Sequence, residues 1–301
     1  MKILVDWIGV TCKLNDPVKN LQSLLPYSLS DYIELDRGGL GYKRSLSCLN
    51  SVIFFDGSEG MGAHLRVSGQ GCRALEAYSV DLFALVSIIA KLEGMQFTRL
   101  DIACDTDVDI LSPTVDKLAE GLYSSKSRKI SVIQSASADG LASSTCYIGS
   151  RSSLVFIRIY DKAKEQGLKS VAWYRAEIEL KKDYIPQAIK LFEESVSEAF
   201  CNILGTYFRP LERKIKPITR SPTAQYWTKF LGEVQKVSLF TEPKAPSVES
   251  KYMWIDKQIG PSLALLSEAF DNTDWLAGLA LKNKKRLKNK DLEIIKAFKE
   301  E

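Results

Sequence analysis

Histidine is nearly absent from this chain, and its scarcity excludes several kinds of catalytic centre. His64 is the only histidine among 301 residues. A metal site that needs two histidines, such as an HExxH helix, therefore cannot form within the chain. A serine–histidine triad is also disfavoured, because His64 lies in the segment AHLRVSG with no matching partner set nearby. We interpret His64 as a structural residue.

Closely spaced cysteine pairs are missing as well. No CxxC sequence occurs, so neither a zinc knuckle nor a redox dithiol is predicted. Scattered single cysteines are typical of reduced thiols in a protein core. The six cysteines of the chain are Cys12, Cys48, Cys72, Cys104, Cys146 and Cys201.

Long apolar runs are the third absence. No uninterrupted run reaches the ~20 residues that a membrane helix needs. The opening segment MKILVDWIGV contains Asp6 and lacks both a cationic start and a clear cleavage site, so it is a poor signal peptide. We therefore expect a cytoplasmic protein with no membrane partner. A phosphate-binding GxxxxGKS or GxxxxGKT loop is also missing, so a built-in ATP-driven helicase is not predicted.

Positive charge is concentrated in one late segment. The net charge is only +4, yet residues 282–290 carry six cations and no acid. Such a block suits a polyanion such as DNA, and an exposed helix end often has the same composition. We consider Lys284, Lys285 and Arg286 as DNA-binding candidates.

The alternation of apolar and polar residues predicts strands and helices that interleave in two halves of similar design. Each half is expected to be an antiparallel sheet covered by helices. The predicted fold is α+β, built from two ferredoxin-like, or RRM-like, halves with helices on one face. The expected strands span 2–10, 46–55, 63–68, 97–104, 129–134, 145–148, 154–162 and 171–181, and the expected helices span 80–92, 113–123 and 186–204.

The character of the sequence changes after about residue 205, where proline becomes frequent and helical periodicity dominates. We predict a catalytic domain over residues 1–210. A small helical C-terminal region is expected over 211–301, where it would bind DNA or a partner. Residues 241–247 are a candidate linker.

Three of the expected strands carry charged residues on one face, where a core strand would carry apolar ones. Side chains alternate between the two faces along a strand, so residues two apart lie together. The shared faces are formed by Arg158, Tyr160 and Lys162, by Arg99, Asp101 and Asp105, and by Arg175, Glu177, Glu179 and Lys181.

If these strands are neighbours, one face of the sheet gathers three carboxylates around a tyrosine. The carboxylates would be those of Asp101, Glu177 and Glu179, with no histidine or cysteine among them. An all-oxygen site of this kind favours Mg²⁺ or Mn²⁺ over zinc. The ion would polarise a phosphate oxygen.

Tyr160 lies between two cations at strand spacing. A tyrosine beside a metal ion can attack a phosphodiester and form a covalent phosphotyrosine. Arg158 and Lys162 are expected to lower the pKa of Tyr160 and to neutralise the phosphate. The alternative is a solvated sheet face, on which alternating charges form ordinary cross-strand pairs.

Several short motifs occur in a definite order. GSR at 149–151 is followed by RIYDK at 158–162, and GQGCR at 69–73, TRLDIACD at 98–105 and an RxExE core at 175–179 accompany them. As a set, these motifs resemble the rolling-circle replication initiators. That family includes staphylococcal plasmid initiators, relaxases of some integrative elements and replication proteins of filamentous phages. The resemblance covers about residues 45–210.

The resemblance implies a DNA nickase and strand transferase. In such enzymes a strand tyrosine attacks one strand of an origin and stays on the 5′ end, while the 3′ hydroxyl primes synthesis. For this chain the resemblance implies that Tyr160 is the nucleophile. It also implies that the domain expected over residues 1–210 is the nicking domain. The metal-ligand candidates are Asp101, Glu177 and Glu179, and the DNA-binding candidates are Ser150, Arg151, Arg99 and Arg175.

Two other functions are compatible with the same residues. A non-catalytic module or regulator that binds single-stranded nucleic acid would stack a base on Tyr160 and use the carboxylates in salt bridges. A polymerase or primase would use a 3′ hydroxyl as its nucleophile and would tolerate Tyr160→Phe. Tyr147 and Tyr174 are candidates for a second tyrosine. The expected partner is origin DNA, with a host helicase and a second copy of the chain as further candidates.

Overall fold

The computed structural model describes residues 2–135, 143–168, 171–232, 260–287 and 289–300, together with 248, 252, 255 and 256. The chain divides into two compact units, Met1–Thr241 and Glu242–Glu301. The linker expected at 241–247 lies outside the described residues.

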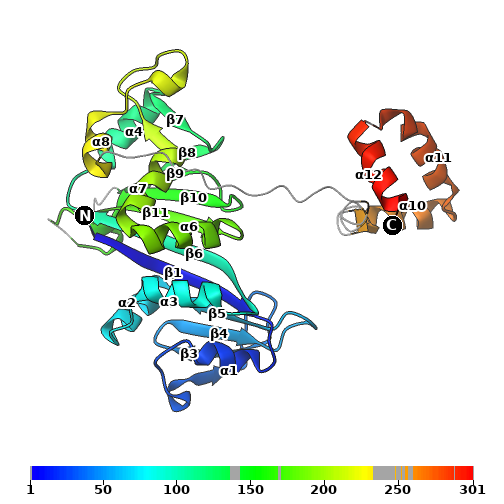
Figure 1. Ribbon diagram of the computed structural model, residues 1–301, viewed down its shortest axis with the longest axis horizontal. Helices are drawn as coiled ribbons and strands as arrows, with labels where there is room; N and C mark the ends of the chain where they lie inside the picture. The colour runs from blue at the N-terminus through cyan, green and yellow to red at the C-terminus, as the bar shows by residue number, and fades with distance from the viewer. Residues whose placement is uncertain are drawn as a thin grey trace. The chain divides into compact units, whose positions relative to one another are not determined.

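A ten-stranded sheet, antiparallel at every pairing, forms the centre of the described part of the first unit (Figure 1). Its order is β2-β3-β4-β5-β1-β6-β11-β10-β9-β8. The α+β architecture with an antiparallel sheet is therefore confirmed. The strands are β1 (Lys2–Cys12), β2 (Ile33–Leu35), β3 (Arg44–Cys48), β4 (Ser51–Phe55), β5 (Ala63–Val67), β6 (Met95–Thr106), β8 (Ile130–Ser135), β9 (Ser143–Ile148), β10 (Val155–Asp161) and β11 (Tyr174–Lys181).

The two halves of the sheet repeat one topology and meet where β1 pairs with β6. In each half a long strand leads to a helix, and an antiparallel meander then returns to pair beside that first strand. The meander ends with β5 against β1 in one half and with β11 against β6 in the other. In a ferredoxin-like unit a second full helix interrupts the strands, whereas among the described residues of the two meanders the only helix is the short α5 (Lys162–Glu165).

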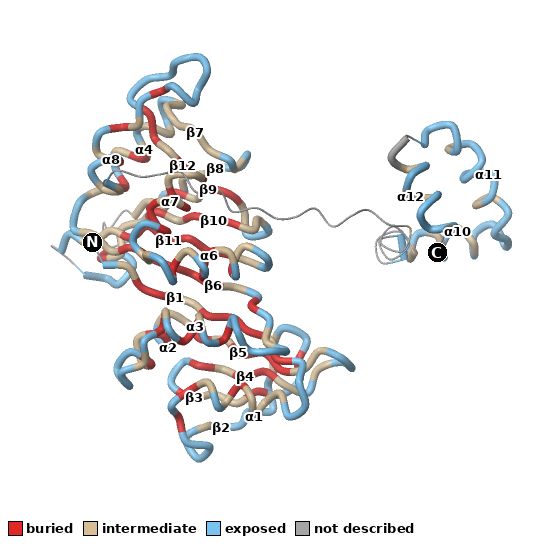
Figure 2. Tube along the Cα trace, in the orientation of Figure 1, coloured by how far each residue is buried: buried red, intermediate tan, exposed pale blue. Residues whose placement is uncertain are grey.

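One face of the sheet carries the hydrophobic core. Its apolar side chains are almost fully buried, as for Val5, Ile8 and Ile102. Helices α3 (Leu82–Lys91), α6 (Tyr184–Glu194) and α7 (Val196–Tyr207) cover this face, and their buried side chains join the same cluster (Figure 1, Figure 2). Alternation along the strands leaves the charged residues on the opposite face.

Several local predictions differ from the structure. Residues 46–55 form two strands, because two residues with positive φ close a tight hairpin between β3 and β4. Helix α2 (Gly69–Ala77) begins directly after the strand expected at 63–68, and no helix was predicted there. The long helix expected at 186–204 is two helices, because Ser195 adopts an extended conformation and its side chain caps the second.

Residues that follow position 210 still pack on the first unit. β12 (Phe208–Pro210) pairs with β7 (Tyr123–Ser125), and α8 (Gln225–Leu231) follows. On α8 the side chain of Trp227 is fully buried, with its ring 5.6 Å from that of Phe208 between centroids. The first unit therefore extends past the boundary expected at 210, because Phe208 before the boundary packs against Trp227 after it. The functions of the ranges 1–210 and 211–301 stay predictions.

The described part of the second unit is helical, as the sequence predicts. No helix in the described ranges combines the length and apolar character needed to cross a membrane. The helices of the second unit are α10 (Gly260–Phe270), α11 (Asp274–Asn283), η3 (Lys284–Arg286) and α12 (Asn289–Glu300), and the shorter elements of the first unit are α1 (Pro17–Gln22), η1 (Leu29–Asp31), α4 (Ser112–Ala119) and η2 (Ile218–Arg220).

Candidate functional site

The polar face of the sheet carries its charged side chains in rows that cross neighbouring strands. Directly paired residues of an antiparallel sheet place their side chains next to each other on one face. One row joins Tyr160 on β10, Arg175 on β11 and Asp105 on β6. The three charged segments found in the sequence are therefore adjacent strands, in the order β6, β11, β10.

Two further rows lie beside the first. Arg158 on β10 pairs with Glu177 on β11. Glu179 on β11 pairs with Asp101 on β6, which in turn pairs with Trp7 on β1. The sheet thus brings the three candidate metal carboxylates onto one surface.

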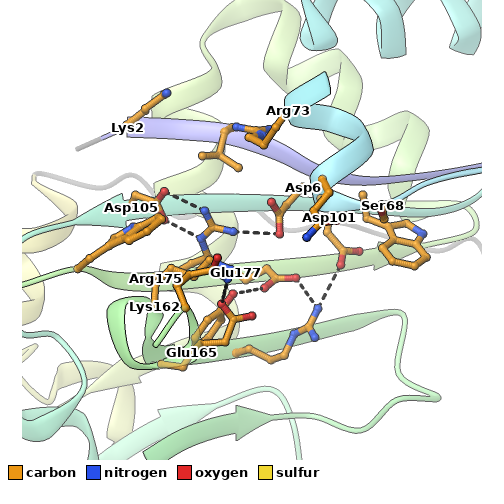
Figure 3. Close-up of a pocket in the computed structure, with 18 of the residues that line it drawn as sticks. Lys2, Asp6, Ser68, Arg73, Asp101, Asp105, Lys162, Glu165, Arg175 and Glu177 are labelled. Carbon is orange, nitrogen blue, oxygen red and sulfur yellow. Dashed lines mark hydrogen bonds and ion pairs between the residues drawn. The ribbon is translucent and has the colours of Figure 1, made fainter. Parts of the chain in front are cut away.

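A cavity of about 620 Å³ opens on this surface (Figure 3). Strands β1, β6, β10 and β11 form its wall together with the start of α2 and the helix α5. Its cationic and acidic side chains nearly balance in number. The cations are Lys2, Arg73, Arg99, Arg158, Lys162 and Arg175, and the acids are Asp6, Asp101, Asp105, Glu165 and Glu177.

The hydroxyl of Tyr160 is in contact with a carboxylate. It donates a hydrogen bond to Oε2 of Glu177 at 3.1 Å. Burial raises the pKa of Tyr160, the charge of Glu177 raises it further, and the charge of Arg175 acts in the opposite direction. This direction is contrary to the sequence prediction, because Arg158 and Lys162 are each paired with an acid. The hydroxyl therefore needs a base to ionise, and Glu177 is within reach.

Lys162 reaches the cavity from a helix and not from a strand. β10 ends at Asp161, whose side chain caps α5, and Lys162 is the first residue of that helix. Its ammonium lies 2.6 Å from the carboxylate of Glu165 and 5.7 Å from the centre of the Tyr160 ring. The cation still lies beside the tyrosine.

Asp101 and Glu177 form a buried acidic pair in the cavity. Only 1% and 4% of their surfaces are exposed. Burial raises the pKa of Asp101, and the adjacent charge of Glu177 also raises it, against the lowering effect of Arg99. Nη2 of Arg158 contacts both acids, at Glu177 Oε1 and, 3.2 Å away, at Asp101 Oδ2. Negative charge on Asp101 is disfavoured by burial and by the neighbouring charge of Glu177, so an added cation would stabilise the ionised Asp101 carboxylate.

Glu179 shares the guanidinium of Arg99 with Asp101 and is also paired with Lys181. Its carboxylate lies 3.1 Å from Nη2 of Arg99 and 2.7 Å from Nζ of Lys181, and it does not line the cavity. Over the described part of the chain, no group of three or more His, Cys, Asp or Glu side chains is arranged to hold a metal ion. Mg²⁺ commonly takes one or two carboxylates, because waters and substrate phosphates supply its other oxygens. The oxygen donors of Asp101 and Glu177 therefore fit a hard divalent ion.

Four residues of β1 also line the cavity, and the sequence pattern did not predict them there: Lys2, Leu4, Asp6 and Trp7. Asp6 forms an ion pair with Arg175, and the guanidinium of Arg99 lies 4.4 Å from the centre of the Trp7 ring. The signal for Asp6 was an acid inside the apolar strand VDWIG, since a buried charge needs a partner.

The other DNA-binding candidates are spread over the described chain. Arg99 and Arg175 line the cavity. Ser150 and Arg151 lie in the turn between β9 and β10, where Gly149 has a φ of 99°, and neither lines the cavity. The candidates in the second unit form η3 and are exposed: Lys284, Lys285 and Arg286.

The two candidate second tyrosines lie outside the cavity. Tyr147 on β9 stacks on Phe156 at 5.8 Å between ring centroids. Tyr174 packs against the hydrophobic core, on the face of the sheet opposite Tyr160.

Comparison with known proteins finds relatives over most of the chain. The family described as replication initiation factor matches residues 95–280, and the N-terminal domain of rolling circle replication initiation proteins matches residues 2–82. The chain is 26% identical over 315 residues to the putative DNA relaxase NicK of Bacillus subtilis, covering 94% of this chain and 88% of that protein. The solved structure of a rolling circle replication initiator protein from Geobacillus stearothermophilus matches with a TM-score of 0.70 and 27% identity, over 80% of this chain and 99% of that one.

Proposed function

This chain belongs to the replication initiation factor family, and on that premise we propose that Tyr160 is the nucleophile with which it cuts one strand of origin DNA. The chain is a rolling-circle replication initiator and a DNA nickase of the relaxase type. The observation that carries the choice of Tyr160 is its hydrogen bond to the buried Glu177, inside a cavity rich in cations.

In the proposed reaction the hydroxyl oxygen of Tyr160 attacks the phosphorus of the scissile phosphodiester. Its proton passes to Oε2 of Glu177, which already accepts the hydrogen bond. The bond from phosphorus to the 3′ oxygen breaks, and that oxygen becomes a 3′ hydroxyl by taking a proton from water. The phosphate stays on Tyr160 as a 5′-phosphotyrosine diester, so the reverse reaction can rejoin the strand.

Arg158 and Lys162 are the cations proposed to meet the phosphate. They flank Tyr160, and their side chains are 27% and 12% exposed at the cavity wall. Cations fixed in a partly dry site stabilise the charge that builds up on phosphate oxygens during transfer. Arg99, 28% exposed in the same wall, is proposed to contact the DNA backbone next to them.

Relaxases and initiators of this kind are generally metal-dependent, and Asp101 and Glu177 are the residues proposed to hold Mg²⁺ or Mn²⁺. When bound, the ion would supply positive charge to the phosphate and to the departing 3′ oxygen. Glu179 stays a candidate third ligand, and its contacts with Arg99 and Lys181 support a role in orienting Arg99.

Binding of origin DNA follows from membership of this family. The turn residues Ser150 and Arg151 and the exposed cations of η3 are proposed as additional contacts to DNA backbone. Recruitment of a host helicase, formation of a homodimer and residence in the cytoplasm remain proposals.

The test is nicking of supercoiled plasmid that carries the origin of the element encoding this protein, with Mg²⁺ or Mn²⁺ present. Denaturing gels should show a nicked circle with protein attached, and Tyr160→Phe or EDTA should abolish both. Nicking that survives Tyr160→Phe would remove this residue as the nucleophile. Binding without nicking by a folded wild-type protein would favour a non-catalytic module.

A further inference from the structure

A second charged cluster lies in the cavity, and the reaction outlined above does not account for it. Its centre is Arg175, whose side chain is 5% exposed (Figure 3). Asp105 holds the guanidinium through two hydrogen bonds, from Nε at 2.6 Å and from Nη2 at 2.8 Å. Asp6 holds the remaining end, with its Oδ2 3.0 Å from Nη1. An arginine bound in this way is poorly placed to bind DNA backbone as the sequence suggested.

Arg175 lies next to Tyr160 in the sheet, so its fixed charge can act on that side chain. It is the direct cross-strand partner of Tyr160, and both side chains face the cavity. Paired residues of an antiparallel sheet have Cβ atoms about 5 Å apart. The fixed positive charge of Arg175 therefore lies on the strand next to Tyr160, in the same cavity as the hydroxyl that loses its proton in the proposed reaction.

Asp6 reaches this cluster because β1 is irregular at that point. The pairing of β1 with β6 shifts between Val5 and Trp7, which leaves Asp6 as the extra residue of a β-bulge. A bulge bends the strand and redirects the side chains around it. Asp6 and its neighbour Trp7 both line the cavity as a result, whereas regular alternation would turn one of them toward the core.

The start of α2 contacts the bulge residue Asp6 and the residue before it, Val5. Gly69 lies so close that a Cβ atom there would be 3.0 Å from Oδ1 of Asp6. Nη2 of Arg73, one turn later, donates a hydrogen bond to the backbone oxygen of Val5 at 2.5 Å. Both residues belong to the segment GQGCR at 69–73, to which the reaction above gives no role.

We propose that Asp6 is a positioning residue for Arg175, and that the segment 69–73 holds Asp6 on its bulge so that the Arg175 charge stays opposite Tyr160. This inference rests on the proposed role of Tyr160 and deepens it. Asp6 touches neither DNA nor the reacting atoms, and it acts only through the guanidinium. Loss of Asp6 should therefore slow the chemical step and leave DNA binding nearly unchanged.

The experiment measures initial nicking rates of the full chain against the concentration of supercoiled origin plasmid, for Asp6→Ala and Asp6→Asn. Asp6→Ala should lower kcat about 10- to 100-fold, because a displaced catalytic group typically costs a factor of this size. The KM for plasmid should stay within about threefold. Asp6→Asn should recover most of the rate, since its amide oxygen can accept the same hydrogen bond from Arg175. Asp116→Ala, an exposed site on α4, is the matched control.

Gly69→Ala supplies an independent test. In the wild-type background its methyl group would push against the Asp6 carboxylate and lower kcat. In the Asp6→Ala background the carboxylate is gone and only the backbone oxygen of residue 6, 3.3 Å from the added methyl group, stays close, so the further fall should be much smaller than in the wild type. Residues that act through one contact show this non-additivity, whereas unrelated structural damage would multiply. Urea unfolding of each variant keeps a loss of folding separate from a loss of rate.

Three results would overturn the inference while the wild type still forms its Tyr160 adduct: a kcat for Asp6→Ala within about threefold of wild type, a change confined to KM, or independent effects of Asp6→Ala and Gly69→Ala. If Asp6→Ala does not fold, Asp6→Asn and Gly69→Ala decide the matter alone. A wild-type protein that forms no adduct would instead refute the proposed function, and this inference with it.

Discussion

Replacing Glu177 with glutamine is the substitution that most directly tests the proposed chemistry. Glu177 accepts the hydrogen bond of Tyr160 at 3.1 Å, and its other oxygen contacts Arg158. Glutamine keeps the shape and can still accept a hydrogen bond, but it cannot take the proton. Removal of a general base typically costs about 10²- to 10⁴-fold in rate, which corresponds to about 3–5 kcal/mol in the activation free energy.

The same substitution should change stability less than it changes rate. Breaking a buried ion pair can cost about 3–5 kcal/mol. Here Arg158 keeps its contact with Asp101 at 3.2 Å, and Asp101 loses an unfavourable neighbouring charge. We therefore expect the free energy of unfolding to fall by only about 1–2 kcal/mol.

Single-turnover nicking of supercoiled origin plasmid, read on denaturing gels, measures the rate, and urea unfolding measures the stability. Glu193→Gln is the matched control, because this glutamate lies on α6 in an ion pair with Lys91 at 2.8 Å, away from the cavity. A folded Glu177→Gln variant that nicks within about tenfold of wild type would refute the assignment of Glu177 as the base.

Four further predictions follow from the same structure. Trp227→Ala should lower the free energy of unfolding of the first unit by about 3–5 kcal/mol in urea, because this ring is fully buried, whereas Trp275→Ala in the second unit should leave that transition in place. Burial, aided by the charge of Arg66, lowers the pKa of His64 from 6.5 to about 4, so between these pH values the unfolded chain binds more protons than the folded chain. The contribution of His64 to the free energy of unfolding should therefore be full above pH 6.5 and fall by up to about 3 kcal/mol as the pH drops toward 4. His64→Gln should remove this loss when unfolding is measured as a function of pH. Asp101→Asn should lower the rate of nicking at a given concentration of Mg²⁺ or Mn²⁺ and weaken binding of Mn²⁺ measured by calorimetry, and unchanged Mn²⁺ binding would exclude Asp101 as a ligand. Neutralising Lys284, Lys285 and Arg286 together should reduce the slope of log affinity for duplex DNA against log salt by about 3, and an unchanged slope would exclude these cations as phosphate contacts.

Most of the sheet was predictable from local pattern. Strict alternation in segments such as TRLDIACD and VFIRIYDK assigns each side chain to a face before any partner strand is known, since the pleat repeats every two residues. The failures were local. A hairpin at 49–50 and the helix start at 69 depend on backbone conformations that the apolar pattern does not encode. Lys162 was predicted to be the last residue of a strand, but it begins helix α5, because Asp161 ends the strand and caps that helix.

The candidate site was predictable in its residues and not in its pairings. The sequence by itself determined that Tyr160, Arg158 and the carboxylates face one way, because alternation along a strand is a local property. Only the tertiary structure decided which residues meet, because register and strand order depend on contacts between distant segments. In the folded chain Arg175 lies opposite Tyr160, Glu179 pairs with Arg99, and a bulge at Asp6 brings a carboxylate from β1 into the cavity.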